Sequence, residues 1–197
     1  VLAYADGTLS VAEPDGVGVP ALLKFDLSKT GGLAECEHAY ARMSKAAGID
    51  AVTTELIGEG TKTKRSHLLV HRFDVATKTP ARRIHFHSLA RLLHFDHRRA
   101  GRSLAYLDLF RTALQLAIPV AELREIARRM LFNVLAANPD DHGRNHAFRY
   151  DEERRTWSLT PAFDVTFHEG MLDRGLRVNG EVWPRIEVMA MMCREVG

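Results

Sequence analysis

The chain has 197 residues, 46% hydrophobic and 26% charged, which is typical of an ordinary soluble globular protein with one large domain or two small lobes. Lys and Arg number 27 against 25 Asp and Glu, so the net charge of +2 gives no overall attraction to nucleic acid. No apolar run reaches transmembrane length, and Cys36 and Cys193 form no CxxC pair, which favours free thiols in a reducing, cytoplasmic setting.

The first part of the chain, residues 1–75, is predicted to be β-rich with one prominent helix. The opening "VLAYADGTLSVAE" has two short apolar runs around Asp6-Gly7, a hairpin pattern, and "PDGVGVP" after it is expected to be a loop. The stretches "ALLKFD" and "SHLLVHRFDV" are typical of strands. Between them, apolar residues recur at steps of three and four and predict a helix over residues 33–47, namely Leu33, Cys36, Tyr40, Met43 and Ala47.

The second part, residues 76–197, is predicted to be mainly helical. "SLARLLHFDHRRAG" and "LAYLDLFRTALQLA" have helical spacing, and residues 121–136 form the clearest amphipathic pattern, which Pro139 ends. "HAFRY" and "TWSLTP" flank the polar "DEERR" and predict a hairpin. The layout is therefore a β-rich lobe joined to a helical lobe, with a loop and hairpin over residues 138–166.

The segment "NPDDHGRN", residues 138–145, is called the acidic loop below. It has three interpretations. Asn, Pro, Asp and Gly are the residues that solvated turns prefer. His142 and His146 are four apart, as in a zinc pair, but that spacing suits zinc only on a helix, which Pro139 and Gly143 disfavour. The third interpretation is phosphoryl transfer.

Phosphoryl transfer needs a carboxylate to orient the attacking hydroxyl and hard oxygen ligands for magnesium. Asp140 and Asn145, five residues apart, can supply both, and Asp164 in "AFDV" follows the hairpin as a second metal ligand. The chemistry also needs a lysine on the β-rich side. Lys24 lies in an apolar strand, and Glu37 on the apolar stripe of the next helix is its natural partner, although an edge-strand lysine with its amine in solvent is the alternative.

The order of these features resembles HipA-type serine/threonine kinases, the toxins of bacterial toxin–antitoxin pairs. The resemblance is carried by "NPDDHGRNHAFRY" and "WSLTPAFDVT" and extends through "ALLKF", "ECEHAYARMSKAAGI", "LLVHRFD" and "RRIHFHSLARLL". It implies an α+β, two-lobed protein-kinase-like fold that uses ATP and Mg²⁺. Lipid kinases of the phosphatidylinositol type have a similar Asp-x-His-x-x-Asn pattern, so a lipid or small-molecule phosphotransferase stays an alternative.

The resemblance also implies roles for individual residues. Asp140 would be the catalytic base, with Asp141 at a variable position, and Asn145 and Asp164 would bind magnesium. The nucleotide would be bound by the remaining candidates, which are Lys24, Glu37, His71, Arg72, Phe73, His142, Gly143, Arg144 and Phe163. Among these, residues 71–73 match the hinge that meets adenine.

Three departures from the family pattern stand out. His71 replaces a common hinge glutamate, and Phe86 stands where a Gln is frequent. The glycine-rich phosphate loop should precede Val1, so the chain is expected to be a kinase core truncated at both ends, with little activity alone. The resemblance further implies a helix-turn-helix, HipB-like antitoxin as partner, contact with DNA only through it, and a protein substrate of the translation machinery. A catalytically inactive antitoxin-binding module is the other alternative.

Overall fold

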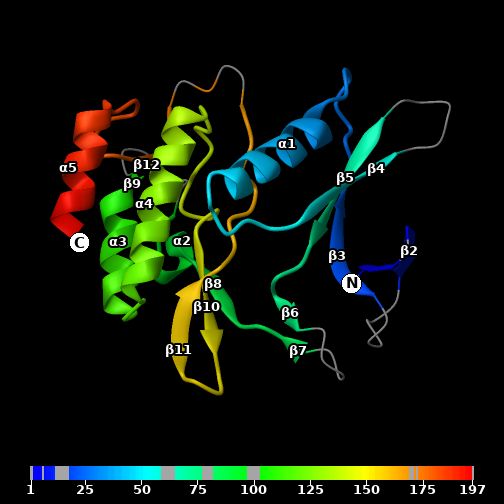
Figure 1. Cartoon of the computed structure of the whole chain (residues 1–197), viewed down its shortest axis with the longest axis horizontal. Helices are drawn as coiled ribbons and strands as arrows, with labels where there is room; N and C mark the ends of the chain where they lie inside the picture. Colours follow the sequence, from blue (N-terminus) through cyan, green and yellow to red (C-terminus); the bar gives the residue numbers. More distant parts are fainter. Residues whose placement is uncertain are drawn as a thin grey trace.

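The structure, a computed structural model, describes residues 2–5, 7–11, 18–58, 65–76, 82–96, 103–168, 171 and 173–196. A large sheet and one helix form one side of the molecule, and the other helices lie together on the opposite side (Figure 1). The expected turn residue Asp6 and most of the expected loop over residues 14–20 lie outside the described residues.

The large sheet is antiparallel and has five strands in the order β2-β1-β3-β5-β4. They are β1 (Leu2–Ala5), β2 (Thr8–Val11), β3 (Val19–Lys24), β4 (Thr54–Gly58) and β5 (Ser66–His71). The predicted strands around Asp6-Gly7, in "ALLKFD" and in "SHLLVHRFDV" are confirmed, the last only as far as His71, whereas β4 was not predicted. β3 starts earlier than expected because Val19 pairs with Tyr4 of β1.

Helix α1 (Leu33–Ala46) forms where the apolar spacing predicts it, but the predicted inward face is partly wrong. Leu33 is 59% and Met43 46% exposed, whereas the buried positions are Ala34, Ala41 and Ser44. Small side chains let the helix approach β4 and β5 closely, so the buried face is rotated away from the larger apolar residues.

The other side of the molecule contains α2 (Leu89–Leu92), α3 (Tyr106–Gln115), α4 (Val120–Leu135) and α5 (Ile186–Val196). The long helix expected from residue 88 onwards is a single turn, α2, which ends at Leu92, and two residues later His94 has a left-handed conformation with φ of 48°. The helices share one apolar core, whose largest fully buried members are Tyr106, Phe110, Phe148, Leu89, Leu109, Ile126, Met130, Leu176 and Met189. None of the helices in the described ranges is long and apolar enough to span a membrane.

Helix α4 carries a buried polar row that its apolar pattern did not reveal. Glu125, Arg129 and Asn133 follow at steps of four and are at most 9% exposed. Arg129 pairs with Glu125 at 3.1 Å and donates to the carbonyl of Thr160 at 2.9 Å, while Glu125 accepts from the backbone of Asp50 at 3.0 Å. The row therefore joins α4 to the chain after α1 and to the end of the hairpin.

Short strands complete the fold. The predicted hairpin is confirmed as β10 (Ala147–Asp151) and β11 (Thr156–Leu159), and β8 (Phe86–Ser88) adds to β10. β6 (Val75–Ala76) pairs with β7 (Arg82–Arg83), and β9 (Leu104–Ala105) runs parallel to β12 (Leu176–Arg177). Both cysteines are free thiols.

Candidate active site

A lysine and two carboxylates connect the two sides of the molecule. Lys24, the last residue of β3, donates to Glu37 of α1 at 2.7 Å and forms a second ion pair with Asp164. Burial lowers the pKa of Lys24, but the charges and hydrogen bonds of the two acids outweigh burial and leave this pKa raised. Lys24 is therefore a fixed cation, as predicted, and not an edge-strand lysine in solvent.

Asp164 reaches Lys24 because the chain before it is pinned to the β-rich side. The backbone of Ala162 exchanges hydrogen bonds with Asp50 and Val52 at 2.7 and 2.9 Å, next to an isolated parallel bridge with Ala51. Asp164 itself has φ of 53°, in the left-handed region that few residues other than glycine adopt. Such conformations cluster at functional sites, where the surrounding structure compensates for the strain.

The acidic loop presents Asp140 and Asn145 toward the same space. The Asn145 amide donates to the Asp140 carbonyl at 2.9 Å, and its backbone N–H donates to His142 at 2.8 Å. The amide nitrogen is thus engaged, which leaves the amide oxygen as a hard acceptor. The Asp140 carboxylate lies 3.7 Å from His142 Nε2 and 3.4 Å from His168 Nε2, and the second histidine was not predicted.

Two adjoining cavities contain nearly all of the predicted site residues. A cavity of about 470 Å³ (the catalytic cavity) is lined by Lys24, Glu37, Asp140, His142, Arg144, Asn145, Phe163, Asp164, Thr166 and His168. A more apolar cavity of about 350 Å³ (the hinge cavity) is lined by Leu22, Lys24, Val52, Val70, His71, Arg72, Phe73, Asp74, Phe86, Phe163 and Asp164. Gly143 alone lines neither, since it is buried with its carbonyl bonded to the Ala90 amide at 2.8 Å.

The hinge segment, residues 71–73, contributes mainly side chains and carbonyls to the hinge cavity. The backbone amides of His71 and Arg72 donate to Thr53 and Pro20 at 2.9 and 2.8 Å. The His71 ring contacts Glu55 at 2.7 Å. Two rings face Phe73, those of Phe163 at 5.5 Å and Phe86 at 5.3 Å between centroids. The cavity therefore offers flat apolar walls suited to a planar base.

Asp141, expected at a variable position, is the centre of a buried polar cluster. Its carboxylate is 1% exposed, accepts from Arg174 at 2.8 Å and from the Tyr106 hydroxyl at 2.7 Å, and lies 3.4 Å from the amide of Leu176. Burial raises the pKa of Asp141 to about 6, against the opposing effect of Arg174. Arg174 also donates to the carbonyl of Asn133 at 3.1 Å, so the cluster fixes the loop to α4.

Gly175 lies directly on the backbone of the acidic loop. Its amide donates to the carbonyl of Pro139 at 2.8 Å, and a β-carbon at this position would lie 2.5 Å from the Cα of His142. Arg174 and Gly175 (the clamp) thus hold the loop from behind. Sequence reasoning missed the clamp, because nothing in "DRGLRV" marks two residues more than 30 positions after their partners as special.

The zinc-pair interpretation of the loop lacks its helical geometry. Residues 143–146 are not helical, and β10 begins at Ala147. His142 lines the catalytic cavity, whereas His146 is buried against Tyr106, with 5.7 Å between ring centroids, and burial lowers its pKa to about 3. Within the described ranges, no group of three or more His, Cys, Asp or Glu side chains is placed to hold a metal ion.

Comparisons with known proteins agree on one protein family. Residues 8–195 match the family described as HipA-like C-terminal domain. A Sinorhizobium fredii (strain NBRC 101917 / NGR234) protein named "Putative kinase Y4dM" is 25% identical over 163 residues, which is 77% of this chain and 38% of that protein.

Two solved structures share the fold. HipA of Shewanella oneidensis MR-1, solved with HipB and its operator DNA, matches all of this chain with a TM-score of 0.80 and 21% identity. The Helicobacter pylori proinflammatory kinase CtkA matches 73% of it with a TM-score of 0.55 and 16% identity. The chain spans half the length of each of these two chains. The predicted two-lobed, kinase-like α+β fold is thereby confirmed.

Proposed function

The chain belongs to the HipA-like C-terminal domain family, and on that premise we propose that it is the catalytic core of a HipA-type, ATP- and Mg²⁺-dependent serine/threonine protein kinase. The observation that carries the proposal is the meeting of Lys24, Asp164, Asp140 and Asn145 around one cavity. These residues come from a strand, a post-hairpin segment and a loop that are far apart in the sequence. Their convergence is what a phosphoryl-transfer site requires.

The residues of the catalytic cavity fit a magnesium–nucleotide complex. The Asn145 amide oxygen and the Asp164 carboxylate are hard donors of the kind that Mg²⁺ prefers, and two protein ligands suffice where phosphates supply others. Magnesium, when bound, would neutralise charge on the phosphates. Lys24, held by Glu37, supplies a further fixed cation for them. Phe73 and Phe163 would bind the base in the hinge cavity.

Asp140 is assigned as the base that orients the acceptor. A carboxylate oxygen of Asp140 accepts the proton of a serine or threonine hydroxyl, whose oxygen forms a bond to the γ-phosphorus as the bond to the ADP oxygen breaks. Most of the rate acceleration then comes from positioning and from preorganised charge. The clamp supports this step indirectly, because it fixes the loop that carries Asp140.

The partners follow from the relatives and are part of the proposal. The Shewanella HipA was solved with HipB and operator DNA, which supports a HipB-like, helix-turn-helix antitoxin as the partner here and DNA contact only through it. A protein substrate in the translation machinery and a cytoplasmic location complete the proposed toxin function. They need tests separate from the catalytic assignment.

The decisive test is magnesium-dependent nucleotide binding, measured by calorimetry with a non-hydrolysable ATP analogue. We expect binding to the 197-residue chain that needs Mg²⁺ and weakens about tenfold or more in Asp164→Asn, since a charged metal ligand is lost. Asp173→Asn is the matched control, because Asp173 is 69% exposed and its recorded partners are the Arg177 side chain and the backbone amide of Arg174, both outside the catalytic cavity. Absence of magnesium-dependent binding, or equal effects of the two variants, would sink the kinase assignment and favour a partner-binding module.

A further inference from the structure

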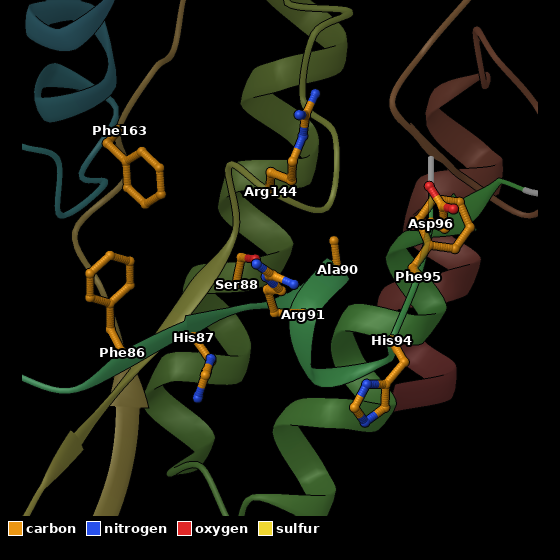
Figure 2. Close-up of a pocket in the computed structure, with 10 residues that line it drawn as sticks. All are labelled: Phe86, His87, Ser88, Ala90, Arg91, His94, Phe95, Asp96, Arg144 and Phe163. Atoms are coloured by element: carbon orange, nitrogen blue, oxygen red, sulfur yellow. The ribbon is translucent and has the colours of Figure 1, made fainter. Parts of the chain in front are cut away.

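A third cavity, larger than the other two, opens beside the candidate active site. It has a volume of about 790 Å³ and is lined by Phe86, His87, Ser88, Ala90, Arg91, His94, Phe95, Asp96, Arg144 and Phe163. Figure 2 shows the rings of Phe86 and Phe163 together on one side, Arg91 in the middle, and His94 and Phe95 on the other side. Neither Arg91, His94 nor Phe95 was singled out as a site residue from the sequence.

This cavity is continuous with the place where Asp140 acts. Arg144 and Phe163 line both it and the catalytic cavity, and Arg144 is four residues after Asp140 on the acidic loop. The hinge cavity, proposed above for the nucleotide base, shares Phe86 and Phe163 with this cavity. A molecule in the third cavity would therefore lie next to the catalytic cavity, which Asp140 lines.

Two arginines line the cavity, and within the described ranges neither of them is paired with a carboxylate. Arg91 and Arg144 are exposed, and no described residue forms an ion pair with either of them. The recorded side-chain contact of Arg144 is 3.4 Å to His142 Nε2, which leaves most of its guanidinium donors available. Asp96 is the one acidic side chain among the lining residues. A guanidinium group at a cavity wall is suited to bind carboxylate or phosphate.

We propose that this third cavity is the acceptor pocket, and that Arg91 and Arg144 bind an anionic side chain close to the phosphorylated hydroxyl of a protein substrate. The anion is a carboxylate or a phosphorylated residue, and the rings of Phe86 and Phe95 hold an apolar neighbour. The proposal rests on the kinase function above and adds the chemical class of its substrate. A protein segment fits better than nucleic acid, because two arginines in a chain of net charge +2 fall short of the extended basic surface that nucleic acid requires.

The test is peptide binding by fluorescence anisotropy, using labelled serine peptides that differ only near the serine, with Asp, phosphoserine, Asn or Lys at the same positions. We expect the Asp and phosphoserine peptides to bind about tenfold more tightly than the Asn and Lys peptides, with an advantage that shrinks in salt. Arg91→Gln should remove most of that advantage. Arg124→Gln, a change to an exposed arginine of α4 outside the cavity, should retain it.

Several results would overturn the proposal. These are equal binding of all four peptides, an unchanged preference in Arg91→Gln, or displacement of the peptides by a short oligoribonucleotide at lower concentration than by unlabelled peptide. Loss of ATP-analogue binding in Arg91→Gln would instead assign the cavity to the nucleotide. Failure of the kinase function is distinguishable, since it would appear as lost magnesium-dependent nucleotide binding in the unsubstituted chain.

Discussion

Removal of Arg174 is the sharpest test of how the acidic loop is held. Its side chain is 0% exposed and donates to the Asp141 carboxylate at 2.8 Å and to the carbonyls of Val182 and Asn133 at 2.9 and 3.1 Å. In Arg174→Met the Asp141 carboxylate would stay buried with only a hydroxyl and an amide to bind it. Breaking a buried pair from one side typically costs about 3–5 kcal/mol. That loss is a large part of the stability of a typical domain, about 5–15 kcal/mol.

The assay is urea unfolding followed by circular dichroism and by tryptophan fluorescence, since Trp183 lies 5.0 Å from the Arg174 guanidinium. Arg177→Met is the matched control, because Arg177 pairs with exposed Asp173 at 3.0 Å, and we expect it to lose under about 1 kcal/mol. A second change, Asp141→Leu, should restore much of the stability lost in Arg174→Met. Equal losses in the two arginine variants, or strictly additive losses in the double variant, would refute the reasoning.

Three further predictions concern the same loop and the start of α1. The folded-state pKa of Asp141, about 6, lies above its ordinary value of 3.8, so this group contributes stability that is lost as pH rises through about 6. We therefore compare the free energy of unfolding in urea of the unsubstituted chain and of Asp141→Asn between pH 4 and 7. The difference in favour of the unsubstituted chain should grow toward low pH by up to about 3 kcal/mol. Gly175→Ala would force its β-carbon against the backbone of His142, so we expect a free energy of unfolding lower by about 1–3 kcal/mol, and weaker magnesium-dependent nucleotide binding by calorimetry. Gly58→Ala is the control, because a β-carbon there meets nothing within 4 Å, and it should change stability and nucleotide binding less. Asp26 accepts from the first two amides of α1, and hydrogen bonds, chiefly from Ser28, lower its pKa to about 2. Asp26→Ala should therefore lower the free energy of unfolding in urea by about 1–2 kcal/mol at pH 7. This difference from the unsubstituted chain should vanish as the pH falls toward 2 and the carboxylate is protonated.

The features that the sequence predicted well are those that local patterns determine. Helix α4 and the hairpin after it follow from apolar spacing and turn residues within short windows. The pairing of Lys24 with Glu37 was also predicted, because a cation in an apolar strand needs a carboxylate partner, whereas the ion pair of Lys24 with Asp164 was not. The need of a lysine in an apolar strand for a carboxylate partner thus predicted a contact that apolar spacing alone does not predict.

The features that the sequence did not predict depend on close packing between distant elements. The inward face of α1 is set by Ala34 and Ala41, whose small size matters only once the sheet is beneath them. Helix α2 begins where the amides of Leu89 and Ala90 donate to the carbonyls of His146 and Gly143, and it ends at Leu92, before the left-handed His94. Neither contact leaves a pattern in its own segment.

The clamp and its partner Asp141 show a physical reason for placing buried charge beside the acidic loop. An apolar core would stabilise the loop through its buried apolar area, but such contacts are not directional and permit several backbone positions that differ by small shifts. Arg174 and Asp141 instead satisfy each other in one arrangement, with Tyr106 and the Pro139 carbonyl as further fixed points. A double variant that replaces the pair by Met and Leu can therefore regain stability and still bind magnesium–nucleotide less well, because Asp140 and Asn145 would lose their fixed spacing to Asp164. Stability and metal-dependent binding would separate in that variant, which a purely structural role of the pair does not predict.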